Sequence, residues 1–351
     1  MKILYAGTLN PSGTCFSRME SLRELGPDVH PFDLDEWIDW ESTGFVQRQF
    51  EQHLCWGPLI RRANRALLAR CREVRPDMVW IDKGDWVQRP TLQAMGDQGC
   101  FLVHHVTDSL HTRGRRYWLK RRLLRATLPD YDVFFTTNID DHAGLLGNEP
   151  PKALLTHLGH DHRRFDGTPL TPEQHEKWDR DLLFVGHYEP ETEEWILALI
   201  DAGLPVTVHG LPPWFRSKHR QRLGDRLFPG LGGDDYVHAL KGAKIGLCFV
   251  SVMNYNQTAS RSCEIPACGT MLLAIRTPQH SEMYEEGVEA EFFGSREELI
   301  EKARYYLEHD EEREAIARRG QERAERSGYS WDALMRRDWP RLLEIYEASR
   351  G

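Results

Sequence analysis

The stretch from residue 244 to residue 275 restricts the fold more than any other part of the chain. It joins a short apolar run (KIGLCFVSV), a polar loop (NYNQTASRS), the segment CEIPAC, a Gly-Thr pair and a second apolar run (MLLAI). Apolar runs of this length, rich in Val, Ile and Phe, are typical of buried strands. The order strand, loop, short helix, turn and strand predicts half of a doubly wound α/β sheet, in which ligands bind at the carboxyl ends of strands. Arg261 and Glu264 place one charge of each sign at such an end, which suits a ligand with both hydroxyls and phosphates.

The same alternation fills the rest of the chain in two series. Strands are expected at 2–6, 77–81, 100–104, 132–137 and 154–158 in the first series, and at 181–185, 205–209 and 245–250 in the second. The polar segment 166–179, which contains Pro and Thr, separates the series. At 351 residues the chain can form two domains, each with its own core. We therefore predict an α/β protein with an N-terminal domain (1–168), a C-terminal domain (169–330) and a final helix in 331–351.

Composition narrows the class of protein and its location. The net charge of −9 argues against a general nucleic-acid-binding role. No apolar run approaches the roughly 20 residues that a membrane-spanning helix needs, and the first apolar run is too short for a signal peptide. The seven cysteines are scattered, mostly within apolar segments, and form no C-x-x-C pair, so buried reduced thiols are expected rather than a metal site. The cytoplasm is the expected location.

Several motifs resemble one family of enzymes. The pattern R-x-x-E-I-P-A-C-G-T-x-L-L-A, followed by R-T-P-x-H and E-E-G-x-E-A-x-F-F, resembles the C-terminal half of group 1 glycosyltransferases. The first half adds R-P-D-M-V-W-I-D-K-G, which is similar to a motif of the CgeB-like branch of that family. The resemblance implies the GT-B architecture, two Rossmann-like domains that face a cleft.

The resemblance also implies a site for a nucleotide-sugar donor in the C-terminal domain. Glu264 is similar to the glutamate that holds the ribose hydroxyls; the alternative is a glutamate that stabilises the dipole of its own helix. Tyr236 is expected near the nucleobase. In related enzymes a basic residue follows the motif G-H-x-E-P, but Thr192 and Glu193 stand there, so Arg261, Lys218 or helix amides would have to neutralise the diphosphate. The complete expected donor set is Gly186, His187, Tyr236, Tyr255, Arg261, Glu264, Gly269 and Thr270.

One departure from the family pattern concerns the sugar itself. Group 1 enzymes carry two glutamates separated by seven residues, and the second matches Glu264. The first falls on Asn256, which can hydrogen-bond sugar hydroxyls but carries no charge. We include Asn256 among the expected catalytic residues, and three interpretations stay open: different handling of the sugar, a changed donor, or lost catalysis.

Two features of the N-terminal half are candidates for the acceptor side or the floor of the cleft. The loop after the first strand contains Gly7, Ser12 and Gly13, and a strand that leads through such a loop into a helix offers N–H groups to an anion; a plain turn explains it equally well. Lys83 follows the strand 77–81 and could meet an anionic acceptor. A surface salt bridge with Asp82 or Asp85 is the alternative.

The densest titratable cluster lies at the end of the strand 100–104. It comprises His104, His105, Asp108 and His111. Asp108 or His105 could take a proton from an acceptor hydroxyl, which makes these two the remaining catalytic candidates. A purely structural role is the main alternative, and the spacing matches no helix-borne zinc motif.

Two helices of the first half carry many cations. Apolar spacing predicts one long helix over 50–74 with an arginine-rich outer face. The segment 112–128 is basic, with leucines at helical spacing. Such a helix could contact a membrane surface or a polyanion, but a half-buried helix whose cations face water is the commoner explanation.

Together these observations predict a glycosyltransferase that moves a sugar from a nucleotide donor, with UDP-sugar favoured, to an unidentified acceptor. The acceptor could be a glycan, a lipid-linked sugar, a protein, a small molecule or a modified nucleobase. By resemblance the reaction is retaining and needs no metal or other cofactor, and the enzyme is cytoplasmic and could be peripheral to the membrane. Two alternatives stay open: a nucleotide-sugar epimerase or hydrolase of the same fold, and a non-catalytic module that binds a glycan or nucleotide.

Overall fold

The computed structural model describes residues 1–40, 42–112, 115–147 and 151–351, with the side chains of 115–117 excepted. Contacts divide the chain into two compact units. Unit 1 comprises Met1–His157, Met253–Asn256 and Trp331–Gly351, and unit 2 comprises Leu158–Val252 and Gln257–Ser330. Within the described residues, no helix is both long and apolar enough to cross a bilayer.

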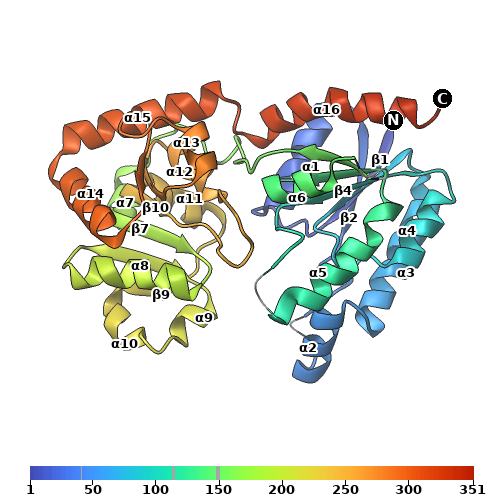
Figure 1. The fold of residues 1–351 in the computed structure, drawn as a ribbon, viewed down its shortest axis with the longest axis horizontal. Coiled ribbons are helices and arrows are strands. Elements are labelled where there is room, and N and C mark those ends of the chain that lie inside the picture. Colours follow the sequence, from blue (N-terminus) through green and yellow to red (C-terminus); the bar gives the residue numbers. More distant parts are fainter. Residues whose placement is uncertain (41, 113–114, 148–150) are drawn as a thin grey trace. The chain divides into compact units, whose positions relative to one another are not determined.

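Unit 1 is built on a parallel sheet with the order β2-β1-β3-β4-β5-β6. Figure 1 labels β1, β2 and β4 of this sheet. The strands are β1 (Lys2–Gly7), β2 (Asp28–Asp33), β3 (Met78–Asp82), β4 (Phe101–Val106), β5 (Val133–Thr136) and β6 (Lys152–Leu155). The helices are α1 (Thr14–Glu24), α2 (Phe45–Leu54), α3 (Pro58–Val74), α4 (Arg89–Gly96), α5 (Arg115–Thr127), α6 (Ile139–Leu145) and α16 (Trp331–Ala348), with a 3-10 turn at Leu128–Asp130.

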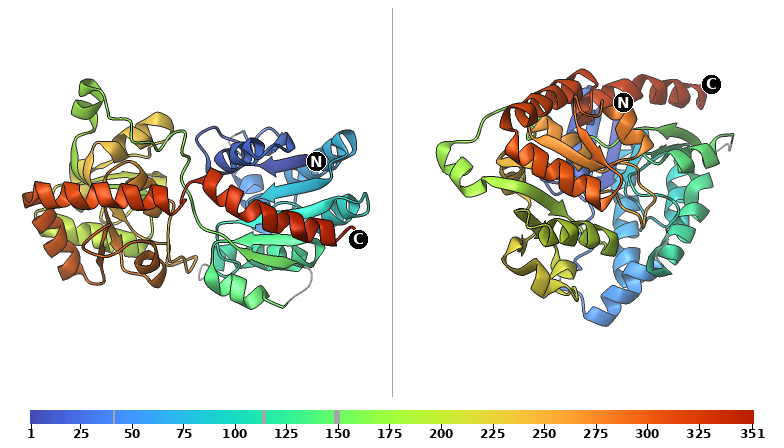
Figure 2. Two further views of the ribbon diagram at one scale, coloured as in Figure 1. Left: turned by 90° about the horizontal axis from the view of Figure 1, so that it is seen from above. Right: turned by 60° about the vertical axis from the view of Figure 1, so that its left-hand side comes forward.

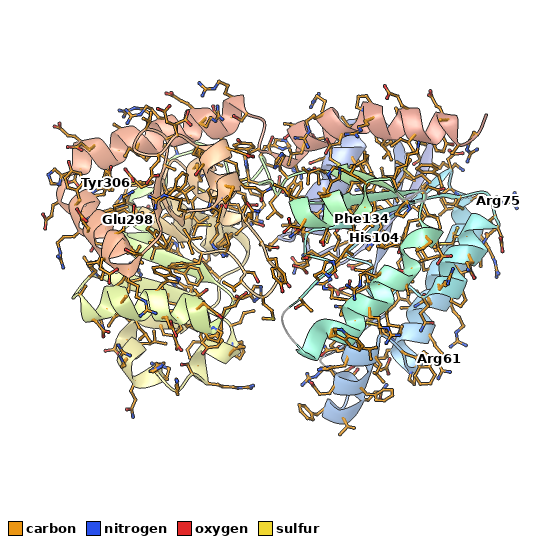
Figure 3. The ribbon with its side chains drawn as sticks, in the orientation of Figure 1. Arg61, Arg75, His104, Phe134, Glu298 and Tyr306 are labelled. Atoms are coloured by element: carbon orange, nitrogen blue, oxygen red, sulfur yellow. The ribbon has the colours of Figure 1, made fainter. Side chains whose placement is uncertain are left out.

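Apolar side chains fill both faces of this sheet. Alternate residues of the strands pack under α1 and α16 on one face, and the intervening residues pack under α3 and α4 on the other. The C-terminal helix α16 packs on α1 and lies across the strands of unit 1 in the left-hand view of Figure 2. His104 and Phe134, both fully buried, lie against each other in this core (Figure 3).

Unit 2 repeats the architecture with the order β12-β11-β10-β7-β8-β9, again all parallel. The strands are β7 (Arg180–Gly186), β8 (Val206–Gly210), β9 (Leu227–Pro229), β10 (Ala243–Cys248), β11 (Met271–Ile275) and β12 (Glu291–Phe293). The helices are α7 (Pro172–Trp178), α8 (Pro190–Asp201), α9 (Pro212–Phe215), α10 (Arg220–Leu223), α11 (Gly233–Lys241), α12 (Arg261–Ala267), α13 (Pro278–Met283), α14 (Arg296–Glu308) and α15 (Asp310–Arg326), with a 3-10 turn at Gly224–Arg226. The described residues thus form two six-stranded, doubly wound sheets, and the predicted doubly wound α/β class is confirmed.

The units differ from the expected domains in two places. Unit 1 ends at His157 rather than at residue 168, and Met253–Asn256, which was expected in the C-terminal domain, belongs to unit 1. The polar segment 166–179 lies in unit 2. There Thr171 and Gln174 form a capping box that starts α7, and Trp178 at its end is buried. The segment is therefore a helix anchored by one tryptophan rather than a linker.

The long helix predicted over 50–74 is wrong, because the structure has two helices. Gly57, with φ of 153°, and Pro58 interrupt the helical pattern. The buried carboxylate of Glu51 in α2 accepts hydrogen bonds from the backbone N–H groups of Leu59 (3.0 Å) and Ile60 (3.1 Å). The end of α2 therefore caps the start of α3 and fixes the corner between them.

A buried ion pair ties α1 to the end of β3. The guanidinium of Arg18 donates to both carboxylate oxygens of Asp82, at 2.8 and 2.7 Å, and both side chains are fully buried. Tyr5 donates a third hydrogen bond to this carboxylate, and Trp331 of α16 covers the guanidinium at 4.5 Å. The pair therefore joins β1, β3, α1 and α16 of unit 1.

We predict that Asp82→Asn lowers the free energy of unfolding of unit 1 by about 3–5 kcal/mol, because it leaves the buried Arg18 charge uncompensated. Denaturant unfolding of the variant measures this loss. The exposed pair of Arg222 and Asp201 provides a control, since Asp201→Asn should cost less than about 1 kcal/mol. Equal losses in the two variants would contradict this role for the buried pair.

Candidate functional site

The order of the strands in unit 2 marks one edge of its sheet as a binding edge. From β7 the chain first adds β8 and β9 on one side and then returns to add β10, β11 and β12 on the other. The order therefore reverses between β7 and β10, and ligands of doubly wound sheets bind at the carboxyl ends of the two strands at such a point. These ends are Gly186 and Cys248.

Gly186 leaves room for a guanidinium at this edge. A Cβ atom at this position would lie 3.0 Å from Nη1 of Arg261 and 2.7 Å from the ring of Phe184. The guanidinium carbon of Arg261 lies 5.1 Å from the centre of the Phe184 ring, and Nη2 donates to the carbonyl of Phe249 at 3.4 Å. Nε of Arg261 is buried and has no hydrogen-bond partner among the described residues. The guanidinium thus keeps donor capacity at the carboxyl edge.

Glu264 lies one turn further along α12 and is 6% exposed. Its Oε2 accepts a hydrogen bond of 2.6 Å from the hydroxyl of Tyr236 in α11. Burial raises the pKa of Glu264, and the hydrogen bond from Tyr236 and the charge of Arg261 partly oppose that rise. Burial, and then the charge of Glu264, raise the pKa of Tyr236 well above its ordinary value. The tyrosine is therefore a neutral donor that orients the carboxylate.

A buried series of hydrogen bonds supports the start of α12. The hydroxyl of Ser262 pairs with Nε2 of His280 at 2.7 Å, and Nδ1 of His280 pairs with the carbonyl of Ile275 at 2.7 Å. The Ile275 carbonyl can only accept, so Nδ1 carries the proton and Nε2 accepts from Ser262. The hydroxyl of Tyr284 donates to the carbonyl of Ser262 at 2.9 Å. Burial lowers the pKa of His280 to about 4, so this support is neutral and rigid.

The structure does not bring the whole expected donor set to this edge. Gly269 and Thr270 precede β11 and so lie at its amino end, where the hydroxyl of Thr270 donates to the carbonyl of Leu240 at 2.6 Å. Gly269 has φ of 74° and ends the turn after α12. His187 is exposed just after β7. Tyr255 and Asn256 fall in the segment Met253–Asn256, which belongs to unit 1.

Glu189, which the sequence analysis did not single out, connects two loops of the binding edge. Its carboxylate accepts from the hydroxyl of Ser251 at 2.5 Å and from the N–H of Val252 at 3.0 Å. The loop after β7 is thereby held to the loop after β10. The signal was present in the motif G-H-Y-E-P, where the glutamate follows a strand end. Thr192 and Glu193 are buried in α8, and Lys218 is exposed after α9.

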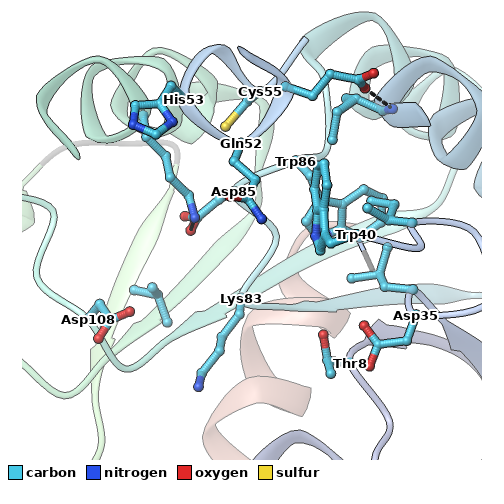
Figure 4. A pocket seen from close by; sticks show the side chains of 16 residues that line it. Thr8, Asp35, Trp40, Gln52, His53, Cys55, Lys83, Asp85, Trp86 and Asp108 are labelled. Carbon is cyan, nitrogen blue, oxygen red and sulfur yellow. Dashed lines mark hydrogen bonds and ion pairs between the residues drawn. The ribbon is translucent and has the colours of Figure 1, made fainter. Parts of the chain in front are cut away.

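Unit 1 has its own cavity at the carboxyl ends of its strands. The order reverses between β1 and β3, and a cavity of about 370 Å³ lies at this edge (Figure 4). Its lining includes residues that follow successive strands, two indole rings and the ammonium of Lys120 in α5. The main lining residues are Thr8, Asp35, Trp40, Lys83, Asp85, Trp86, Asp108 and Lys120. Polar groups and aromatic rings around one cavity are typical of sites for small polar ligands.

One side of the cavity is an ion-pair network. Lys120 pairs with Asp85 at 2.6 Å, and Arg121 bridges Asp85 (3.4 Å) and Asp108 (3.3 Å). Burial alone would raise the pKa of Asp85, but the charges of Lys120 and Arg121 outweigh it and lower that pKa. Asp108 also accepts from Asn254 at 3.4 Å, and 42% of its side chain is exposed. Asp108 is therefore an oriented, accessible carboxylate.

Lys83 forms neither of the two salt bridges considered for it, with Asp82 or with Asp85. Asp82 is taken by Arg18, and Asp85 is taken by Lys120 and Arg121. Lys83 adopts the left-handed conformation with φ of 53°, and in the described part of the chain its ammonium has neither an ion pair nor a hydrogen bond. In Figure 4 it extends between Asp108 and Thr8. It is an uncommitted cation at the cavity.

His105 does not reach the cavity, and its expected role as a proton acceptor is corrected. The ring is fully buried between Trp80 and Phe135, and neither ring nitrogen has a hydrogen bond among the described residues. Burial, and then the charge of Arg18, lower its pKa to about 3. Helices cover both faces of the sheet, so His105 belongs to the core although it is close to the strand end. His111 is exposed and pairs with Arg125 at 3.0 Å.

The other residues of unit 1 that were expected at the floor of the cleft lie at or near this edge. Gly7 ends β1, where a Cβ atom would lie 3.3 Å from Cβ of Asp82, and Gly13 is the N-cap residue of α1. The N–H of Ser12 donates to Asn10 at 2.9 Å. None of the three lines the cavity, whereas the neighbouring Thr8 does.

The lining residues that the sequence analysis missed include Asp35, Trp40 and Trp86. Asp35 and Trp40 follow β2, and Trp86 follows β3. Burial, and then the neighbouring charge of Asp33, raise the pKa of Asp35. Trp86 is 8% exposed, and its Nε1 has no hydrogen-bond partner among the described residues. A polar or aromatic residue soon after a strand was the signal that could have found them.

The basic helix of 112–128 is half-buried, but its cations do not all face water. Leu124 and Leu128 are buried, while Lys120 and Arg121 turn inward to Asp85. Residues 113–114 lie outside the described part of the chain.

Two doubly wound parallel sheets in one chain are the architecture of the GT-B fold. Residues 190–337, which include Arg261, Glu264 and Tyr236, match the model of the family described as glycosyl transferase-like. No sequence among curated proteins matches the chain. The match identifies a glycosyl transferase-like segment within this chain, and the narrower CgeB-like branch stays a prediction.

Solved structures carry the same fold over nearly the whole chain. Sucrose-phosphate synthase from Thermosynechococcus elongatus superposes with a TM-score of 0.71 at 12% identity, covering 99% of this chain and 100% of that one. HepE of Anabaena in complex with UDP-glucose gives 0.69 at 15% identity, covering 98% and 100%. A putative UDP-N-acetylglucosamine 2-epimerase from Listeria monocytogenes gives 0.55 at 17% identity, covering 91% and 90%. At these identities the likeness establishes the fold, and the predicted fold class is confirmed.

We predict that buried histidines make the protein lose stability in acid. The pKa values of His104 and His280 are lowered to about 4, and that of His105 to about 3, because burial disfavours the charged rings. The unfolded chain therefore binds more protons, so the stability present above about pH 6.5 is lost as the pH falls toward 4. Each histidine contributes a slope of up to about 1.4 kcal/mol per pH unit. Urea unfolding between these pH values measures the slope.

The variant His280→Gln should reduce that slope for unit 2, and the exposed His175→Gln provides the control. A slope that is unchanged in His280→Gln would show that His280 is not held neutral in the folded state.

Proposed function

We propose that the chain is a glycosyltransferase that takes a sugar from a nucleoside diphosphate sugar and transfers it to an acceptor hydroxyl. The observation that carries the proposal is the group of Arg261, Glu264 and Tyr236 at the carboxyl ends of β7 and β10. It lies within the segment that matches the glycosyl transferase-like family. A buried carboxylate that keeps accepting capacity beside a guanidinium with a spare donor matches a ligand with vicinal hydroxyls and a diphosphate.

Glu264 would accept hydrogen bonds from the ribose hydroxyls of the donor, and Tyr236 would orient the carboxylate. Arg261 would stabilise the negative charge that develops on the diphosphate as the glycosidic bond breaks. Lys218, exposed after α9, is a second candidate for this charge. Arginine and lysine are the residues that supply this stabilisation without a metal, and we propose a metal-independent reaction with retention at the anomeric carbon. UDP is the favoured nucleotide of the donor because a similar fold, HepE of Anabaena, binds UDP-glucose.

The cavity of unit 1 is the proposed acceptor site. Trp86 and Trp40 offer flat apolar surfaces for a sugar ring, and Asp35 and Asp108 offer carboxylates for its hydroxyls. Asp108 is held by Arg121 and Asn254, so it can orient an acceptor hydroxyl without itself moving. Lys83 would hold an anionic group of the acceptor.

We predict that Glu264→Gln weakens UDP binding by about tenfold to a hundredfold, because charge-assisted hydrogen bonds to the ribose are worth about 1.5–3 kcal/mol. Isothermal titration with UDP, GDP, dTDP, ADP and CDP gives the base preference and the loss. Arg261→Gln should weaken UDP binding more than uridine binding, since uridine lacks the diphosphate.

Glu291 is a matched control in the same unit. It is a buried glutamate that accepts a hydrogen bond of 2.7 Å from the hydroxyl of Tyr306, but it lies at the amino end of β12. Glu291→Gln should therefore bind UDP like the unchanged chain. Full UDP affinity in the Glu264→Gln variant would contradict the proposed donor site. The site would also be wrong if Glu291→Gln lost as much UDP affinity as Glu264→Gln.

Turnover of donor alone separates the alternatives. An epimerase converts UDP-N-acetylglucosamine to its 2-epimer without an acceptor, and one similar fold is described as a putative enzyme of that kind. A transferase leaves the sugar configuration of the donor unchanged and releases UDP only as sugar is transferred. Binding of UDP-sugars without either reaction across an acceptor panel would favour the non-catalytic module.

A further inference from the structure

Unit 1 exposes a concentrated apolar surface around α2 and α5, which we call the aromatic face. It comprises Phe45, Val46 and Phe50 of α2, Trp56 in the following turn, and Trp118 and Leu123 of α5. Their exposed fractions are 69, 80, 49, 51, 52 and 38%, respectively. The two helices pack against each other, so these side chains share one region of unit 1. Apolar side chains gathered in this way mark a surface that is covered by a partner or a membrane.

An arginine lies beside three of the four exposed aromatic side chains of this face. The guanidinium of Arg48 lies 5.9 Å from the ring of Phe45, that of Arg61 lies 5.0 Å from Trp56, and that of Arg122 lies 5.5 Å from Trp118. Among the residues that the structure describes, none of these three arginines forms an ion pair. Figure 3 labels Arg61 at the end of unit 1 where α2 lies.

Acidic groups are nearly lacking on the aromatic face. Within 42–65 and 118–127 the sequence contains one acidic residue, Glu51, and its carboxylate is buried at the start of α3. The whole chain carries a net charge of −9, so this local excess of cations is opposite to the overall charge. A covering partner must therefore be both apolar and negatively charged.

An apolar cavity opens beside the same residues. It has a volume of about 440 Å³ and is lined mainly by apolar side chains, including Leu54, Trp56, Leu123 and Leu124, with Arg89 among them. It also shares Cys55, Asp85 and Trp86 with the polar cavity described above. The aromatic face is thus hollowed, with space for hydrocarbon next to the proposed acceptor site.

We propose that the aromatic face binds the surface of a bilayer that contains anionic lipids. The rings of Phe50, Trp56 and Trp118 would enter the boundary between headgroups and acyl chains, and the arginines would pair with lipid phosphates. A second copy of the chain fits less well, because a twofold interface would place the arginines of one copy against those of the other. The proposal concerns unit 1 alone and does not require donor binding by unit 2.

Flotation with vesicles tests the proposal. The chain should float with phosphatidylcholine vesicles that contain about one third phosphatidylglycerol, float much less with pure phosphatidylcholine, and be released as salt screens the charges. The triple variant Phe50→Ser, Trp56→Ser, Trp118→Ser should lower the partition coefficient by roughly tenfold or more. The variant Arg48→Gln, Arg61→Gln, Arg122→Gln should lose the preference for phosphatidylglycerol.

Unit 2 offers a matched control. Leu211 and Phe215 are 46 and 37% exposed, and Arg220 lies over the Phe215 ring at 5.7 Å, yet they stand outside the aromatic face. Leu211→Ser with Phe215→Ser should float like the unchanged chain, and all variants should retain their circular dichroism and UDP binding.

Absence of flotation would overturn the proposal, as would equal flotation of the triple serine variant. Self-association in lipid-free sedimentation that the same triple variant abolishes would also overturn it, because the face would then bind a second copy.

Discussion

Every candidate group depends on one constraint, the parallel arrangement of both sheets. Parallel strands place all their carboxyl ends at one edge, and each sheet reverses its order once, between β7 and β10 in unit 2 and between β1 and β3 in unit 1. The loops at these edges carry the groups that chemistry needs. The Arg261, Glu264 and Tyr236 group and the cavity with Lys83 and Asp108 are two instances of the same topological rule.

The two edges are stabilised by different means. In unit 2 a neutral hydrogen-bonded chain from Ile275 through His280 to Ser262 supports α12. The charged side chains of this helix are Arg261 and the buried Glu264, which accepts a hydrogen bond from Tyr236. In unit 1 the carboxylates are already satisfied by cations: Asp82 by Arg18, and Asp85 by Lys120 and Arg121. Because both carboxylates are already paired, Lys83 forms no ion pair among the described residues. The buried pairs fix the framework, and the remaining groups are available to a ligand.

The sequence predicts the fold well, because the fold follows from local patterns. Apolar runs mark the strands, and the positions of Arg261 and Glu264 relative to the end of β10 put them on the first turn of α12. It fails where a long-range contact decides the outcome. His105 looks accessible at a strand end, but Trp80, Phe135 and Trp331 enclose it. The break at Gly57 and Pro58 depends on a cap from Glu51, and Thr270 has the right motif but lies at the amino end of its strand.

The central claim is that unit 2 holds a nucleoside diphosphate at the carboxyl ends of β7 and β10. A crystal structure of the chain grown with UDP tests it most directly. The account predicts both ribose hydroxyls within hydrogen-bond distance of the Glu264 carboxylate and the diphosphate beside the guanidinium of Arg261. Uridine diphosphate bound elsewhere in unit 2, or in the cavity of unit 1, would contradict it.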